Sequence, residues 1–417
     1  MTAPQRHGLL SLDDALVRLL ASATPPLDTE IIRVGDADGR VLAQNVVSAL
    51  HVPPQDNSSM DGYAVRCSDL HIPGLALPVS QRIAAGSSGQ TLQPGTIARI
   101  FTGAPVPPGA DAIVMQEDCT VLPPVHGDTD GARVKVNTRP ALGQFIRRAG
   151  EDVARGKTVL ASGQRLGPAE LGLAASIGMA DLEVARSPRV ALFSTGDELV
   201  MPGSVAPQDM PAGAIYNSNR FFLAALLRRL GCVVTDLGIV PDRRDATVQA
   251  LRDAAQMHDV ILTSGGVSVG EEDHIKPAVQ TLGTLDLWQI AMKPGKPFAH
   301  GRIGAAHFLG LPGNPVSSFV TFLVLVRPFL LKLQGQSALA MKVIPARADF
   351  KWDRPDKRRE FLRARYNPEG GLALFANQGS GVLTSAVWGD GLVDNPPGKA
   401  VEPGDTVRFI LFSELLA

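Results

Sequence analysis

The sequence has few cysteines and almost no net charge. Its 417 residues carry a formal net charge of −1 and three cysteines, Cys67, Cys119 and Cys232. Cysteines so few and so far apart support neither a disulfide framework nor a cysteine-based metal site, and they fit a reducing cytosol. A net charge near zero lacks the excess of basic residues that is typical of proteins binding nucleic acid or an anionic membrane. Any site for an anion must therefore be local.

Long apolar runs are also missing. The longest, Phe319 to Val326, is followed by Arg327-Pro328 and is far shorter than the roughly 20 residues that span a membrane. Asp13 and Asp14 lie inside the first apolar stretch, where a signal-peptide core would not tolerate them well. We therefore expect a soluble, cytoplasmic protein with no membrane or nucleic-acid partner. Its length predicts about three domains.

The first half of the chain predicts a helix followed by β-rich segments. Ser11 caps a helix that ends near Ala23, because apolar residues follow it at helical spacing. Residues 75–146 alternate short apolar runs with Gly/Pro turns, which predicts a small all-β module. Pro168 and Gly178 mark the beginning and the end of another helix.

From Arg189 the pattern alternates strand and helix, which predicts a parallel, doubly wound α/β sheet. The predicted strands are 190–194, 233–239, 260–263 and 285–292. The predicted helices are 219–230, 246–257 and 315–333, with a further helix expected after residue 273. Beyond Gln334 the helical period disappears. Short strands within 343–350, 360–366, 372–376 and 406–412 then predict a small β-barrel.

The stretch 259–276 carries the clearest chemical pattern. A buried strand, 260–263, leads into a loop with three glycines, Ser264-Gly265-Gly266-Val267-Ser268-Val269-Gly270, which lets several backbone N–H groups face one anion. Glu271, Glu272 and Asp273 follow, where they could simply cap a helix. Phosphate and carboxylate would repel by about 4 kcal/mol at 4 Å and an effective dielectric of 20. A bridging Mg²⁺ would remove that repulsion.

Three more loops are expected at the same edge of the sheet, where ligands of such folds bind. They are 195–198 with Glu198, 240–242 with Asp242, and 293–296 with Lys293 and Lys296. Carboxylates in three loops and paired lysines in the fourth favour a binding cleft over helix capping alone. Pro294-Gly295 favours a type II turn, which would bring the two ammonium groups together on an oxyanion. The rigid turn 311–315 begins the long helix.

Seven motifs together resemble the MoeA family of molybdopterin molybdenumtransferases, which is related to the E domain of gephyrin. They are SSMDGYA (58–64), FTGAPVP (101–107), RRAGEDV (147–153), STGDEL (194–199), SGGVSVGEED (264–273), KPGKP (293–297) and LPGNPVS (311–317). The resemblance implies an elongated homodimer of four subdomains. These are a rod-like part (1–50 and 148–187), an inserted mostly-β part (51–147), an α/β molybdopterin-binding domain (188–334) and a C-terminal β-barrel (335–417).

The resemblance also implies an activity, in which molybdate enters the dithiolene of adenylylated molybdopterin and AMP is released with Mg²⁺ as cofactor. The implied catalytic residues are Asp61, Thr102, Glu198, Asp242, Asp273, Lys293 and Lys296, of which Glu198, Asp242 and Asp273 are the metal-ligand candidates. The implied substrate-binding residues are Ser264, Gly265, Gly266, Ser268, Gly270, Pro312 and Pro315, and in the barrel, where the alignment has gaps, Arg363 and Ser380. His274 and Arg243 depart from the residues frequent in the family.

Two other functions remain open at this point. An adenylyltransferase of the sister family shares the α/β domain but forms the AMP–pterin bond, and the full set of four modules argues against it. A scaffold that only binds partners is the other alternative, and the retained polar residues argue against it. Other proteins of molybdenum cofactor synthesis are candidate partners.

Overall fold

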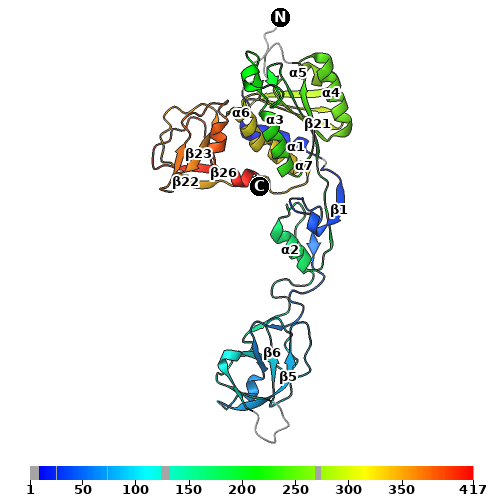
Figure 1. Cartoon of the computed structure of the whole chain (residues 1–417), viewed down its shortest axis with the longest axis vertical. Helices are drawn as coiled ribbons and strands as arrows, with labels where there is room; N and C mark the ends of the chain where they lie inside the picture. Colours follow the sequence, from blue (N-terminus) through cyan, green and yellow to red (C-terminus); the bar gives the residue numbers. More distant parts are fainter. Residues whose placement is uncertain (1–8, 25, 73, 124–131, 268–273, 417) are drawn as a thin grey trace.

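The computed structural model describes residues 9–24, 26–72, 74–123, 132–267 and 274–416. The molecule is elongated, with an α/β part at one end and an all-β module at the other (Figure 1). A narrower segment connects these ends, and a C-terminal β part lies beside the α/β part.

The α/β part is built on a six-stranded sheet with helices on both faces, as the sequence predicts for a doubly wound fold. Its strand order is β16 (Val233–Val240), β13 (Arg189–Thr195), β17 (Val260–Ser264), β21 (Ala306–Leu311), β20 (Pro297–Ile303) and β18 (Gly283–Gln289). The first four strands are parallel, whereas β20 is antiparallel to both of its neighbours. The prediction of an all-parallel sheet was therefore wrong at this edge.

The helices divide into two layers, each with its own hydrophobic core. One face is covered by α1 (Leu12–Ser22), α3 (Asn219–Arg229), α6 (Pro315–Thr321) and α7 (Arg327–Leu333), and the other by α4 (Arg244–Met257) and α5 (Ile275–Leu282). Ser11 caps α1 as predicted, because its hydroxyl accepts a hydrogen bond from the Asp14 N–H at 3.0 Å.

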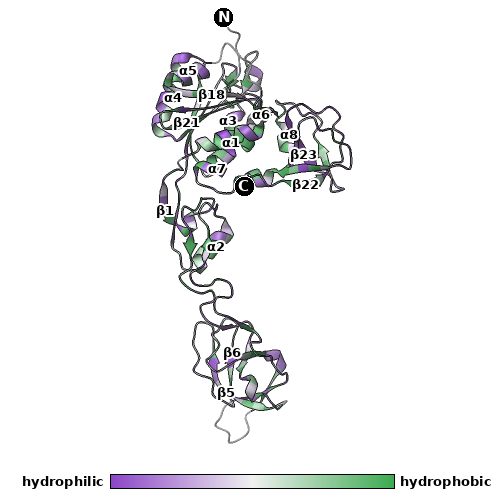
Figure 2. Ribbon diagram, turned by 180° about the vertical axis from the view of Figure 1, so that it is seen from behind, coloured by the Kyte–Doolittle hydropathy of each residue, from purple (hydrophilic) through white to green (hydrophobic). Residues whose placement is uncertain are grey.

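The helical stretch Pro315–Leu333 includes a π-helical turn, Phe322–Val326, between α6 and α7. By length and composition it could cross a membrane, but 89% of its most apolar window is buried inside the protein. Figure 2 shows hydrophobic residues in α7 where it packs beside the sheet. This stretch therefore has the character of a core helix.

The module at the far end has a second six-stranded sheet. Its strand order is β7 (Ala112–Met115), β4 (Gly62–Val65), β6 (Ile97–Ile100), β5 (Ala76–Ile83), β9 (Arg133–Val136) and β8 (Cys119–Leu122). Buried apolar residues line both faces of this sheet. The connecting segment contains β1 (Thr29–Arg33) paired with β12 (Asp181–Ala185), β2 (Val46–Val47) paired with β11 (Thr158–Leu160), and α2 (Pro168–Ser176).

The C-terminal part is a ring of strands. Its sheet order is β19 (Met292–Lys293), β23 (Arg359–Tyr366), β25 (Gly391–Asn395), β26 (Thr406–Leu411) and β22 (Ile344–Arg347), with β24 (Leu372–Leu374) paired to β23. A bridge between Ala348 and Leu372 joins the end of β22 to β24 and closes the ring. β19 lies in the connection between β18 and β20 of the α/β sheet, so this connection contributes a short strand to the C-terminal sheet.

Candidate active site

A cavity of about 540 Å³ lies at the carboxyl ends of β13 and β17, where the sequence predicts a cleft. Loops from several elements line it, and the predicted residues among them are Glu198, Asp242, Ser264, Gly265, Gly266, Pro312 and Pro315. Lys293, Lys296, Arg363 and Ser380 are not part of this lining, although Pro297 is. Ser268, Gly270 and Asp273 lie outside the described residues.

The glycines after β17 are required by the backbone and by close neighbours. Gly265 and Gly266 have φ angles of +96° and +66°, which side chains other than hydrogen rarely allow. A Cβ on Gly266 would lie 2.5 Å from Cγ1 of Ile275. The Gly265 N–H donates to the Leu311 carbonyl at 3.1 Å, so the anion nest that the sequence predicts would use later N–H groups of the loop.

Asn219, at the start of α3, ties this loop to the turn before α6. Its Nδ2 donates to the Ser264 hydroxyl at 2.8 Å and to the Gly313 carbonyl at 2.7 Å. Among the described residues, the buried atoms Ser194 Oγ, Asn217 Nδ2 and Asn219 Oδ1 have no hydrogen-bond partner. These residues line the cavity, so the atoms are available to a ligand. Sequence reasoning missed the two asparagines because asparagines before a helix are typical of caps, and it missed Ser194 because Ser194 ends a predicted strand.

Two carboxylates face the same cavity. Glu198 follows β13 and lies against Gly196, where a Cβ would come within 2.5 Å of its Oε2 atom. Asp242 follows β16 and is half-buried. No group of three His, Cys, Asp or Glu side chains suited to a metal occurs among the described residues. Two carboxylates nevertheless fit Mg²⁺, which takes its other ligands from water and phosphate.

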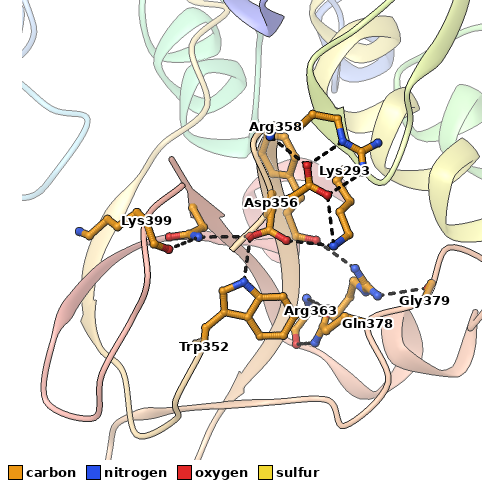
Figure 3. A network of polar contacts seen from close by, with 11 residues as sticks. Lys293, Trp352, Asp356, Arg358, Arg363, Gln378, Gly379 and Lys399 are labelled. Atoms are coloured by element: carbon orange, nitrogen blue, oxygen red, sulfur yellow. Dashed lines mark hydrogen bonds and ion pairs between the residues drawn. The ribbon is translucent and has the colours of Figure 1, made fainter. Parts of the chain in front are cut away.

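The lysine loop is held by the C-terminal part. Lys293 Nζ lies 3.2 Å from Glu360 Oε1 and 3.5 Å from Asp356 Oδ2 (Figure 3). Lys296 is exposed, and its side chain has no hydrogen bond or ion pair with the described residues. Gly295 has the positive φ expected from the sequence, whereas the cis Lys293–Pro294 bond was not expected. The sequence predicts that the ammonium groups of Lys293 and Lys296 converge on an oxyanion. It gives no sign of the two carboxylates that hold Lys293.

Arg363 carries a buried charge without a carboxylate beside it in the described chain. Its side chain donates to the Ser385 hydroxyl at 3.0 Å and to the carbonyls of Phe361 and Gly379 at 3.0 and 3.3 Å. Burial lowers its pKa to about 10, so it remains a cation at neutral pH. The Ser380 carbonyl accepts a hydrogen bond from the Val316 N–H at 2.9 Å. The loop that contains Gly379 and Ser380 therefore joins Arg363 to the beginning of α6, whose first residue, Pro315, lines the cavity.

Asp61 and Thr102 contact each other in the distant module. Asp61 Oδ1 accepts hydrogen bonds from the Thr102 N–H at 2.7 Å and from its hydroxyl at 2.8 Å. These bonds, with a smaller effect of Arg99, lower the pKa of Asp61. Asp61 directly precedes β4 and Thr102 follows β6, and this module lies at the opposite end of the molecule from the α/β part that holds the cavity (Figure 1). A single chain does not bring this pair to the cavity.

Comparisons with known proteins cover most of the chain. Family models match residues 10–178 (MoeA N-terminal region, domain I and II), 191–332 (probable molybdopterin binding domain) and 345–412 (MoeA C-terminal region, domain IV). A molybdopterin molybdenumtransferase of Haemophilus influenzae is 44% identical over 329 residues, which are 79% of this chain and 78% of that protein. Molybdopterin molybdenumtransferase 2 of Mycobacterium tuberculosis is 38% identical over 86% of this chain and 89% of its own length. A crystal structure of the molybdopterin biosynthesis MoeA protein from Pyrococcus horikoshii OT3 has a TM-score of 0.82 at 26% identity, covering 97% of this chain and 100% of that one.

Proposed function

The chain belongs to the MoeA family, and from that premise we propose that its cavity inserts molybdate into adenylylated molybdopterin and releases AMP. The protein is a transferase of molybdenum cofactor biosynthesis, with molybdopterin as its substrate class. The observation that carries the assignment to this cavity is the glycine loop after β17. It lies beside two carboxylates and three unpartnered polar atoms.

The glycine loop would hold the phosphates of the adenylylated pterin through backbone N–H groups. Ser194, Asn217 and Asn219 would bond polar groups of the substrate with their open atoms. Glu198 and Asp242, together with Asp273, would hold Mg²⁺, which offsets charge developing on the leaving AMP when it is bound. Ser268 and Gly270 are proposed to extend the phosphate contacts.

Molybdate would bind between the α/β part and the barrel. Arg363 supports this assignment because its buried charge lacks a carboxylate in the described chain, and Lys296 because it is exposed and unpaired there. Ser380, Pro312 and Pro315 would shape the site, since the Ser380 carbonyl bonds the first turn of α6. Lys293 belongs to the same loop and would fix its position or contact the oxyanion.

Asp61 and Thr102 would reach this site from a second copy of the chain, in a homodimer. Because the hydrogen bonds from Thr102 lower its pKa, Asp61 is ionised at neutral pH and acts as an acceptor. It would orient the substrate or take up a proton as molybdate exchanges its oxygens. We place the reaction in the cytoplasm. We retain the division into 1–50 with 148–187, 51–147, 188–334 and 335–417. The separate cores of the rod-like part, the inserted module and the barrel support it, whereas α1, from the first range, packs in the core of the α/β part.

The test supplies purified full-length protein with adenylylated molybdopterin, Mg²⁺ and molybdate. AMP release that depends on molybdate, together with molybdenum cofactor formation, is the expected result. AMP release without molybdate dependence, or consumption of ATP, would instead indicate the sister adenylyltransferase activity. Binding of adenylylated molybdopterin without any turnover would indicate a scaffold.

A further inference from the structure

Lys293 is part of the barrel as well as of the α/β part. β19 pairs in parallel with the start of β23, so that Lys293 lies opposite Glu360. The Arg359 N–H also donates to the Ala291 carbonyl at 2.9 Å. β19 ends at Lys293 and the chain then turns back, because the Ile290 N–H donates to the Lys296 carbonyl at 2.7 Å, whereas Arg363 lies three residues after Glu360 on β23. The Lys293–Glu360 contact therefore sets the lysine loop relative to Arg363.

Glu360 is fully buried in this network. Its side chain is 0% exposed, and its second oxygen accepts hydrogen bonds from Trp352 Nε1 at 2.8 Å and Asn395 Nδ2 at 3.4 Å. In the described chain, Lys293 is the cation in ion-pair contact with it. Burying a carboxylate without a paired cation is costly, so this position needs the Lys293 charge.

The neighbouring carboxylate is already neutralised. Arg358 Nε and Nη2 lie 2.9 and 2.8 Å from the two oxygens of Asp356, and this bidentate bond holds the pKa of Asp356 far below its usual range. The positive charges of Lys293 and Arg358 thus balance the negative charges of Asp356 and Glu360. Arg363 and Lys296 have no such partner in the described chain. An incoming oxyanion is therefore attracted by Arg363 and Lys296 and not by Lys293.

We propose that Glu360 is a positioning residue, which binds Lys293 and so fixes the lysine loop where Lys296 and Arg363 receive the oxyanion. Lys293 acts through Glu360 and does not contact the oxyanion. Only the identity of that anion, molybdate, rests on the proposed function. The pair thus makes the oxyanion site depend on docking of the barrel against the α/β part.

The test is a double-mutant cycle in the full-length protein, with Lys293→Gln, Glu360→Gln and the combined variant. Equilibrium molybdate binding, the half-saturating molybdate concentration for AMP release and the melting temperature are measured for each. Each single change is expected to weaken molybdate binding about tenfold, because one charge of the pair is left alone. The combined variant should recover to within about threefold of the unchanged protein.

Lys296→Gln provides the matched control. It should weaken molybdate binding by itself, and its loss should combine with that of Glu360→Gln to less than the product of the two, because Glu360 acts by placing Lys296. If the combined Lys293→Gln and Glu360→Gln variant binds molybdate as weakly as Lys293→Gln alone, Lys293 contacts the anion and the proposal is wrong. Unchanged molybdate binding in Lys296→Gln would equally overturn it.

If Glu360→Gln fails to fold, Trp352→Phe replaces it in the same measurements. It removes one hydrogen bond to Glu360 and leaves both charges, so a smaller loss of molybdate affinity with a nearly normal melting temperature is expected. A lower melting temperature with unchanged molybdate binding would mean that the network is only structural. Absence of molybdate-dependent AMP release from the unchanged protein would defeat the proposed function alone, since the cycle is also read from molybdate binding.

Discussion

At the scale of single residues, Glu198 and Asp242 differ from the many other carboxylates of this chain in their position. Each follows a parallel strand of the α/β sheet and lines the cavity beside the glycine loop. Glu198 takes part in no ion pair with the described residues and is exposed. A carboxylate that serves as a metal ligand should affect the metal requirement much more than folding.

We expect Glu198→Gln to raise the Mg²⁺ concentration needed for AMP release by roughly tenfold or more, because a neutral amide is a poorer ligand for a hard cation. The same substitution should leave the melting temperature nearly unchanged, since Glu198 is exposed. Mg²⁺ titrations of AMP release and thermal melting of the same preparation give the two values. Asp242→Asn and Asp273→Asn should behave alike.

Asp197→Asn is the matched control for Glu198→Gln. Asp197 is the exposed neighbour of Glu198 and is absent from the cavity lining, so its Mg²⁺ requirement should stay normal. A parallel collapse of melting temperature and activity in Glu198→Gln would show instead that the carboxylate caps the local turn.

The residues of the cavity differ in how far the sequence could predict them. Gly265, Gly266 and Glu198 follow predicted strands, so their place at one sheet edge follows from the alternation of strand and helix. Glu360 lies 67 positions from Lys293, and no local pattern indicates that β19, in the connection between β18 and β20, pairs with β23. Its contact with Lys293 therefore required the structure.

At the scale of elements, the β20–β21 hairpin was missed by sequence reasoning. Its residues include His300, Arg302 and His307, which interrupt the apolar pattern typical of a buried strand. In the structure both histidines are buried on the face of the sheet that α1 and α7 cover. His300 Nε2 lies 3.1 Å from the Ser22 hydroxyl, and the His307 ring centroid lies 4.9 Å from that of Phe329. Because of these polar residues, the sequence pattern did not predict the two core strands.

These histidines predict an acid-sensitive fold. Burial lowers the pKa of His300 to about 4 and that of His307 to about 3, below the ordinary value near 6.5. The unfolded chain therefore binds protons first, and the free energy of unfolding falls as the pH drops from 6.5 toward 4. Each histidine contributes up to about 1.4 kcal/mol per pH unit in that window. Urea unfolding at pH 7.5, 6, 5 and 4 measures this slope.

His300→Gln should flatten the slope, although it also lowers stability at pH 7.5 through lost packing. His71→Gln is the control, because His71 is exposed on the distant module. An unchanged slope in His300→Gln would assign the acid sensitivity to other groups, such as Asp259, whose pKa is held low by hydrogen bonds from Arg186 and Arg189.

At the scale of the whole molecule, the sequence predicts the order of the parts but not their separation. The all-β module and the α/β part lie at opposite ends in Figure 1, and the paired strands β1 and β12 belong to the segment between them. Asp61 and Thr102 therefore complete the cavity only if another chain supplies them. Closed two-fold dimers are the commonest way to bring one end of a chain to the other end of its copy.

We therefore expect a homodimer in light scattering across a dilution series, and mutual rescue between two variants with damage at opposite ends. At a Mg²⁺ concentration that just saturates the unchanged protein, Asp61→Asn and Glu198→Gln should each lose most activity as pure dimers. After unfolding and refolding together in equal amounts, half of the dimers contain one chain of each kind. In such a dimer, one of the two cavities combines an intact Glu198 with an intact Asp61 from the partner. The mixture should then regain about a quarter of the unchanged activity.

A cavity built within one chain would regain none, because every chain in the mixture carries one damaged residue. Mixing Glu198→Gln with Asp242→Asn is the matched control, since both changes damage the same end, and it should regain nothing if the partner supplies only the Asp61 end.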